Sequence, residues 1–258
     1  MHLPVRIATL AAALLVCAGV PTAVQAAETV TLHTSFSPDR LGASTTIGFG
    51  FDVAGPGGGP PSPLRSVSLH LPPGIDYLST TLGLAICQPA ALLARGLAGC
   101  SPNSLLGFGS AFVEVPFGLG SGHEIPRIDA LMGPPHDGNI VVLFYADGRE
   151  PVYAQLVLQG ELVAGTQTIG GSLDATVPLI LSVPSGPPVS ILSVRTTIGP
   201  AHLTYHERVH GRTVSFHPVG VSVPLNCPRG GFQFSALFAF QDGTSAVARS
   251  TVPCPRRR

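Results

Sequence analysis

Apolar and polar residues alternate along most of this chain, in short runs that predict β-strands. The first run covers 29–36, and the second covers 45–53, where Ile47, Phe49 and Phe51 share one face. Further runs are expected at 66–71, 110–117, 128–131, 139–146, 152–163, 177–183 and 189–197. Many short strands without alternating helices predict an all-β fold of antiparallel sheets, which we expect to form a β-sandwich with Ig-like layers.

A hairpin is predicted near the C-terminus, with its turn at Asp242-Gly243. Pairing outward from a two-residue turn places Phe240 opposite Ser245 and Phe238 opposite Val247. Four aromatic side chains then share one face of the hairpin, which we expect to be buried core: Phe232, Phe234, Phe238 and Phe240.

Residues 89–95 contain good helix formers, begin with Pro89 and are followed by Gly96, so they predict one short helix. This helix lies between Cys87 and Cys100. We therefore expect a helix bracketed by two cysteines within the β-rich chain.

The N-terminus has the pattern of an export signal. His2 and Arg6 are followed by an apolar run at 7–20 and by small residues around Ala26, a typical cleavage site. No later stretch approaches the roughly twenty apolar residues of a membrane-spanning helix, so no transmembrane span is expected after cleavage. The expected organisation is a cleaved signal peptide at 1–26, an N-terminal β-rich region at 27–117 and a C-terminal β-sandwich region at 118–258, with a single domain as the alternative.

Export determines how the cysteines are interpreted, because disulfides form in oxidising compartments. Of five cysteines, four remain after cleavage, and they allow three pairings: Cys87, Cys100, Cys227 and Cys254. We favour Cys87–Cys100 and Cys227–Cys254, since each pair is nearest in sequence and the hairpin brings the second pair together. A four-cysteine zinc site is the rival, but no C-x-x-C spacing is present.

Charge excludes one class of function. The chain has 14 basic and 14 acidic residues, and every basic residue is Arg. Without a basic surface field, nucleic-acid binding is not expected. The low charged fraction of 11% and the frequent Gly and Pro residues fit a strand-and-turn protein.

One motif has the pattern of a catalytic site. His206, Glu207 and His210 match the H-E-x-x-H signature of zinc peptidases. That chemistry needs a helix, because only there do side chains four residues apart reach one metal. Residues 201–216 are rich in poor helix formers, and we expect a hairpin that turns at His210-Gly211. On a strand, the two histidines would be about 13 Å apart.

Other candidate chemistry is sparse. No nucleophile elbow or phosphate-binding loop is present, and the carboxylates are scattered along the sequence. His123-Glu124, which follows a glycine-rich loop, is a further candidate site.

Several short motifs in this chain also occur together in a known group of proteins: Leu71-Pro-Pro-Gly74, Cys87, Gly99-Cys100-Ser-Pro-Asn-Ser104, Gly107-Phe-Gly-Ser110, Cys227-Pro-Arg-Gly-Gly-Phe232, Asp242-Gly243 and Val252-Pro-Cys254-Pro255. On these motifs the chain resembles a family of uncharacterised, secreted, β-rich proteins from high-G+C actinobacteria. The resemblance implies a structural framework with two cysteine pairs and transfers no catalytic residues. The H-E-x-x-H segment is not part of that shared pattern.

These observations predict an exported, non-enzymatic protein of the cell envelope or extracellular space, secreted or held at the cell surface, with a binding or structural role. No cofactor is expected. Its partner is not identified by the sequence, although a component of the cell envelope fits the expected location. The alternative function is that of a zinc-dependent hydrolase or peptidase using His206, His210 and Glu207.

Overall fold

The computed structural model describes residues 27–75, 81–166 and 169–255, and the expected signal peptide 1–26 lies outside these ranges. Strands dominate the described residues, and every strand pair among them is antiparallel. In chain order the strands are β1 (Thr29–Ser37), β2 (Ser44–Ala54), β3 (Leu64–Leu71), β4 (Leu105–Phe117), β5 (Gly120–Glu124), β6 (Arg127–Met132), β7 (Ile140–Gly148), β8 (Ala154–Thr166), β9 (Ile169–Thr176), β10 (Ser190–Ile198), β11 (Tyr205–Val209), β12 (Arg212–Phe216), β13 (Val221–Ser222), β14 (Phe232–Phe240) and β15 (Ser245–Val252). The helical elements are α1 (Pro89–Arg95) and the 3-10 turns η1 (Pro56–Gly58), η2 (Gly96–Gly99) and η3 (Pro102–Ser104).

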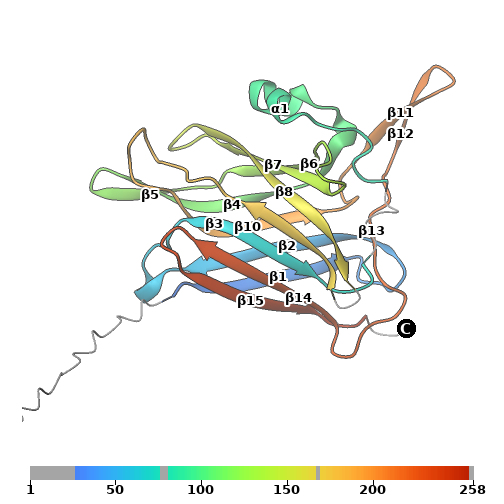
Figure 1. The fold of residues 1–258 in the computed structure, drawn as a ribbon. Helices are drawn as coiled ribbons and strands as arrows, with labels where there is room; N and C mark the ends of the chain where they lie inside the picture. The colour runs from blue at the N-terminus through green and yellow to red at the C-terminus, as the bar shows by residue number, and fades with distance from the viewer. Residues whose placement is uncertain (1–26, 76–80, 167–168, 256–258) are drawn as a thin grey trace, which may run out of the picture.

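One large sheet forms the body of the molecule. Its strands follow the order β1-β2-β10-β4-β6-β7-β8-β9-β3-β14-β15, with β5 paired to β4 and β13 paired to β2. The sheet curls until its first and last strands meet, and there the hydroxyl of Thr34 donates a hydrogen bond to Ser250 Oγ at 2.9 Å (Figure 1). The result is a nearly closed, barrel-like sheet with an enclosed interior.

The expected all-β, antiparallel class is correct, but the structure does not confirm an Ig-like sandwich. A sandwich has two separate sheets, whereas these strands join in one continuous order. Alternation along a strand determines which face is buried. It does not determine whether the opposite wall belongs to a second sheet or to the same sheet curled round.

Strands from the two expected regions interleave in this sheet. Strand β10 lies between β2 and β4, and β3 lies between β9 and β14. The boundary expected at 117/118 falls at the end of β4, just before the turn into β5. It therefore does not separate two sheets.

The aromatic face of β14 forms the core where the sheet closes. Phe232, Phe234 and Phe238 are at most 1% exposed. Phe238 packs edge-on against Phe51 of β2 with ring centroids 5.0 Å apart, and Phe232 packs against Phe36 of β1 at 5.3 Å. The predicted buried stripe is confirmed, and it joins the C-terminal hairpin to the first two strands.

The predicted pairing of that hairpin is wrong by one residue. Phe238 lies opposite Ala246 rather than Val247. The cause is the turn, which uses an extra residue: Gly243 N donates to Phe240 O, and Phe240 N donates to Thr244 O. Gly243 has a φ of 88°, the left-handed conformation that a three-residue hairpin loop with a bulge requires.

Both predicted disulfides are present, Cys87–Cys100 and Cys227–Cys254. The first brackets α1, whose bounds match the prediction. Leu92 of α1 is fully buried against the outer face of β7, beside Leu143 and Tyr145. Strand β7 is therefore covered on both faces.

None of the described helices has the length and apolar character needed to cross a lipid bilayer.

The strand predicted at 177–183 is wrong. The chain forms β9 over Ile169–Thr176 instead, and the next residues make a loop with a single bridge between Leu181 and Pro188. Gly170 and Gly171 conceal β9 in the sequence, because paired glycines are typical of a turn. Residues 177–183 are apolar because several of their side chains face the interior of the large sheet.

We expect Phe238→Ala to lower the free energy of unfolding by about 3–5 kcal/mol, because it removes a fully buried ring that packs between β14 and β2. Leu237→Ala is the matched control. This neighbouring side chain is 46% exposed on the other face of β14, so a loss below about 1 kcal/mol is expected. Urea denaturation of both variants measures the difference. Equal losses would contradict the closing role of the aromatic stripe.

Candidate functional site

The H-E-x-x-H segment is a hairpin that projects from one end of the sheet (Figure 1). The predicted turn is confirmed: His210 and Gly211 both have positive φ, and His206 lies opposite Ser215. His206 Nδ1 lies 3.1 Å from Ser215 Oγ, and Glu207 is exposed. The extended chain therefore separates the two histidines, and the geometry of a zinc peptidase is not formed.

The hairpin is fixed at its base. Tyr205 is fully buried, donates a hydrogen bond to the carbonyl of Leu105 and accepts one from Gly83 N at 3.0 Å. Burial raises the pKa of the Tyr205 hydroxyl, so it stays neutral. The backbone of His206 exchanges two hydrogen bonds with the side chain of Asn103. Across the described residues, no group of three or more His, Cys, Asp or Glu side chains is arranged to hold a metal ion.

A second polar cluster lies on the outer face of β3 and β9. Ser68 and Ser172 donate hydrogen bonds to the carboxylate of Asp174 at 2.5 and 2.7 Å, and His70 Nε2 lies 3.4 Å from Ser68 Oγ. In a hydrolytic triad the imidazole lies between the hydroxyl and the carboxylate. Here the Ser68 hydroxyl lies between the other two groups. The cluster therefore does not activate a nucleophile.

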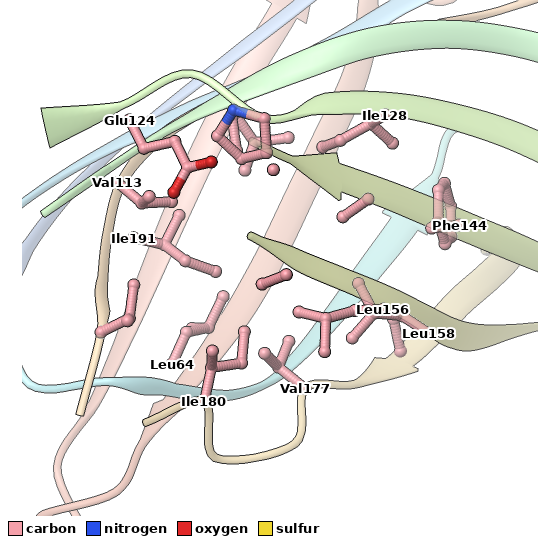
Figure 2. A pocket seen from close by; sticks show the side chains of 18 of the residues that line it. Leu64, Val113, Glu124, Ile128, Phe144, Leu156, Leu158, Val177, Ile180 and Ile191 are labelled. Carbon is pink, nitrogen blue, oxygen red and sulfur yellow. The ribbon is translucent and has the colours of Figure 1, made fainter. Parts of the chain in front are cut away.

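The most distinctive site lies inside the sheet. An apolar cavity of about 170 Å³, the space open to the centres of water-sized molecules, lies between the walls made by β2, β3, β4 and β6–β10. Small side chains line much of it and leave the space unfilled: Ala111, Ala146, Gly148, Ala154 and Ala175. Larger aliphatic and aromatic side chains complete the lining, and Figure 2 shows several of them converging on the space: Leu64, Val113, Ile128, Phe144, Leu156 and Ile191.

The width of the sheet explains why this space exists. About eight strands enclose an interior that side chains can just fill, and wider closed sheets enclose cavities. The continuous order here has eleven strands. Near β14 the phenylalanines fill the interior, whereas the alanines and glycines of β7–β9 do not.

Thr196 lines the cavity with its hydroxyl bonded to the carbonyl of Phe49, and two further polar side chains interrupt the apolar lining. Glu124, at the end of β5, is 8% exposed and points its carboxylate into the cavity (Figure 2). It accepts a hydrogen bond from Glu150 N at 3.2 Å. Ser182 is 2% exposed, and within the described residues its hydroxyl has no hydrogen-bond partner. A buried, unpaired hydroxyl is costly. The Ser182 oxygen has less than 1 Å² of accessible surface, so its side chain would have to rotate to meet a molecule in the cavity.

The other charged groups near this end lie outside the cavity. Asp147 alternates with Ala146 and Gly148 on β7, and its side chain therefore faces outward. Hydrogen bonds from Arg149 and Gln155 lower the pKa of Asp147 below its usual value and keep it ionised. In the described part of the chain, Glu124 is the only ionisable side chain that lines the cavity.

The sequence identified this site only in part. His123-Glu124 was a candidate, and the structure places Glu124 in the cavity while His123 stacks outside on Phe112 with ring centroids 4.9 Å apart. Residues 177–183 are apolar because Val177, Ile180 and Leu181 line the cavity from a loop, not because they form a strand. An apolar run flanked by Pro178 and Pro184 was the available signal for such a loop.

No family model, curated protein or solved structure matches the chain. The resemblance to secreted actinobacterial proteins therefore stays a prediction. Function has to be inferred from the cavity and its lining.

We expect purified protein to contain far less than one zinc ion per chain, because His206 and His210 diverge on the hairpin. Elemental analysis by mass spectrometry measures this, and His206→Ala should give the same value. His136→Ala, which removes an exposed histidine elsewhere, is the matched control. One zinc per chain that disappears only in His206→Ala would overturn the hairpin interpretation.

Proposed function

We propose that this protein is an exported, non-enzymatic binding protein that holds an apolar molecule inside its curled sheet. The observation that carries this proposal is the cavity. Its lining is almost entirely hydrocarbon, and its polar side chains are Glu124, the unpaired Ser182 and Thr196, whose hydroxyl is bonded to Phe49 O. A concave apolar site with a few converging polar groups is typical of small-molecule binding.

The physics of the cavity favours an apolar occupant over water. Water in such a space finds few partners, and an engineered apolar cavity of about 150 Å³ stays dry and binds benzene. The cavity here, of about 170 Å³, is similar in size and lining. An apolar molecule would leave water and gain contacts with the walls, at about 25 cal/mol for each Å² of surface buried.

The proposed location is the extracellular space or the cell surface. The expected signal peptide at 1–26 supports export, and two disulfides suit an oxidising compartment. A binding protein there, whether secreted or part of the cell envelope, would carry or shelter a molecule that water dissolves poorly. The alternative zinc hydrolase gains no support from the extended segment that carries His206 and His210.

The proposal predicts binding of N-phenyl-1-naphthylamine, a neutral apolar dye that fluoresces when it leaves water. Ala146→Phe should weaken binding by about tenfold or more, because the new ring occupies the cavity. Ala54→Phe, at the exposed end of β2, is the matched control and should bind as the parent does. Fluorescence titration gives the affinities, and a cooperative thermal transition verifies folding. Equal binding by both variants would place the dye elsewhere and refute the proposal.

A further inference from the structure

A second apolar cavity, of about 100 Å³, lies in the same interior. It has five lining residues in common with the first cavity, and we call these five the belt: Phe49, Leu69, Phe144, Leu173 and Thr196. The hydroxyl of Thr196 donates to the carbonyl of Phe49, so the belt presents no free donor to the interior.

The two cavities lie end to end along the strands. On β7, Ala146 and Gly148 line the first cavity, Phe144 belongs to the belt, and Val142 lines the second. The same order holds on three further strands: Phe51, Phe49 and Ile47 on β2; Val194, Thr196 and Ile198 on β10; Val67, Leu69 and Leu71 on β3. Four strands thus define one line through the interior.

The length of this line limits the size of an occupant. Gly148 lies six positions after Val142 on the strand, and six residue steps span about 20 Å. A hydrocarbon chain built from bonds of about 1.5 Å in a zigzag covers that distance with about fifteen carbons. The two cavities together therefore match one long chain, whereas the first alone matches a short one.

The belt that divides this line consists of side chains. Gly160 of β8 faces it, and a Cβ added there would lie 3.1 Å from both Leu173 Cδ1 and Phe144 Cε2. These two side chains thus close over the bare backbone of Gly160. Rotation of Phe144 and Leu173 can open the belt without breaking any pairing between strands.

Apart from Thr196 in the belt, the polar side chains belong to the first cavity only. Glu124 and Ser182 line the first cavity and not the second. An occupant thus meets one polar end and an otherwise apolar path. The Glu124 carboxyl group already accepts a hydrogen bond from Glu150 N, and its oxygens favour a head group that donates further ones. A carboxylate head group brings only acceptors, and it would place two like charges together whenever both groups are ionised.

We propose that the occupant is a single-chain amphiphile of about fifteen carbons with an alcohol or amine head group at Glu124, whose tail passes the belt into the second cavity. This inference rests on the proposed function and names its ligand class. The belt then determines which chain lengths bind tightly.

The test is displacement of N-phenyl-1-naphthylamine by octanol, dodecanol and hexadecanol. Affinity should rise by about fourfold for each methylene buried, up to hexadecanol. Val142→Phe fills the second cavity and should abolish the gain from dodecanol to hexadecanol while leaving octanol unchanged. Val221→Phe, which fills the same cavity from β13, repeats the test if the first variant does not fold. Val247→Phe, on an exposed position of β15, is the matched control.

The head group is tested with compounds of one chain length. Hexadecanol and hexadecylamine should bind at least about tenfold more tightly than hexadecanoic acid, and Glu124→Gln should bring the acid to within about twofold of the alcohol.

The outcomes separate the two proposals. If neither the dye nor any alcohol binds, the proposed function fails and the inference fails with it. If alcohols bind but the cavity-filling variants keep the parent's dependence on chain length, or if the acid binds as well as the alcohol, the inference is overturned while the proposed function stands.

Discussion

Closure of the sheet by aromatic packing is the constraint on which the rest of this structure depends. The phenylalanines of β14 contact Phe36 and Phe51, which belong to the first two strands of the chain. These contacts hold the last hairpin against the start of the sheet, although no ladder of backbone hydrogen bonds joins β1 to β15 among the described residues. Side-chain burial therefore replaces backbone pairing where the sheet closes, and it protects two edges that would otherwise attract other chains.

The cavity follows from that closure. Large rings fill one side of the interior, and alanines and glycines leave the opposite side open. Outside the open side, α1 and its disulfide cover β7, so the wall of the cavity is supported from behind. A wall packed on its outer face can keep its shape around a space that no side chain fills, and this is the condition for a preformed binding site.

The β11–β12 hairpin, which forms a separate two-stranded sheet, shows how a motif can match a catalytic signature without forming its site. On a helix, these five residue types can bind a zinc ion. In this chain they lie on a strand and turn of a solvent-exposed hairpin, where the same chemistry is not formed. The choice between helix and hairpin came from local preferences, namely poor helix formers and a glycine at the turn. These preferences were readable in the sequence, and the hairpin could be predicted.

Local features were predicted well because each depends on residues close together in the chain. Alternation identified most strands, the spacing of Cys87, Cys100, Cys227 and Cys254 gave the disulfides, and Pro89 with Gly96 marked the helix. Predictions failed where a local pattern had two meanings. The glycines of β9 resembled a turn, and the Asp242-Gly243 turn took one residue more than the simplest hairpin, which shifted the pairing.

By itself, the sequence indicated most of the strands, the favoured cysteine pairs and the polarity of most strand faces, since periodicity and spacing are properties of short segments. Only the tertiary structure decided that eleven strands curl into one sheet, that Glu124 and Ser182 face the same space, and that 177–183 lines a cavity. These outcomes depend on which distant strands become neighbours. That choice is made by the packing of the whole interior, and no short stretch of sequence contains it.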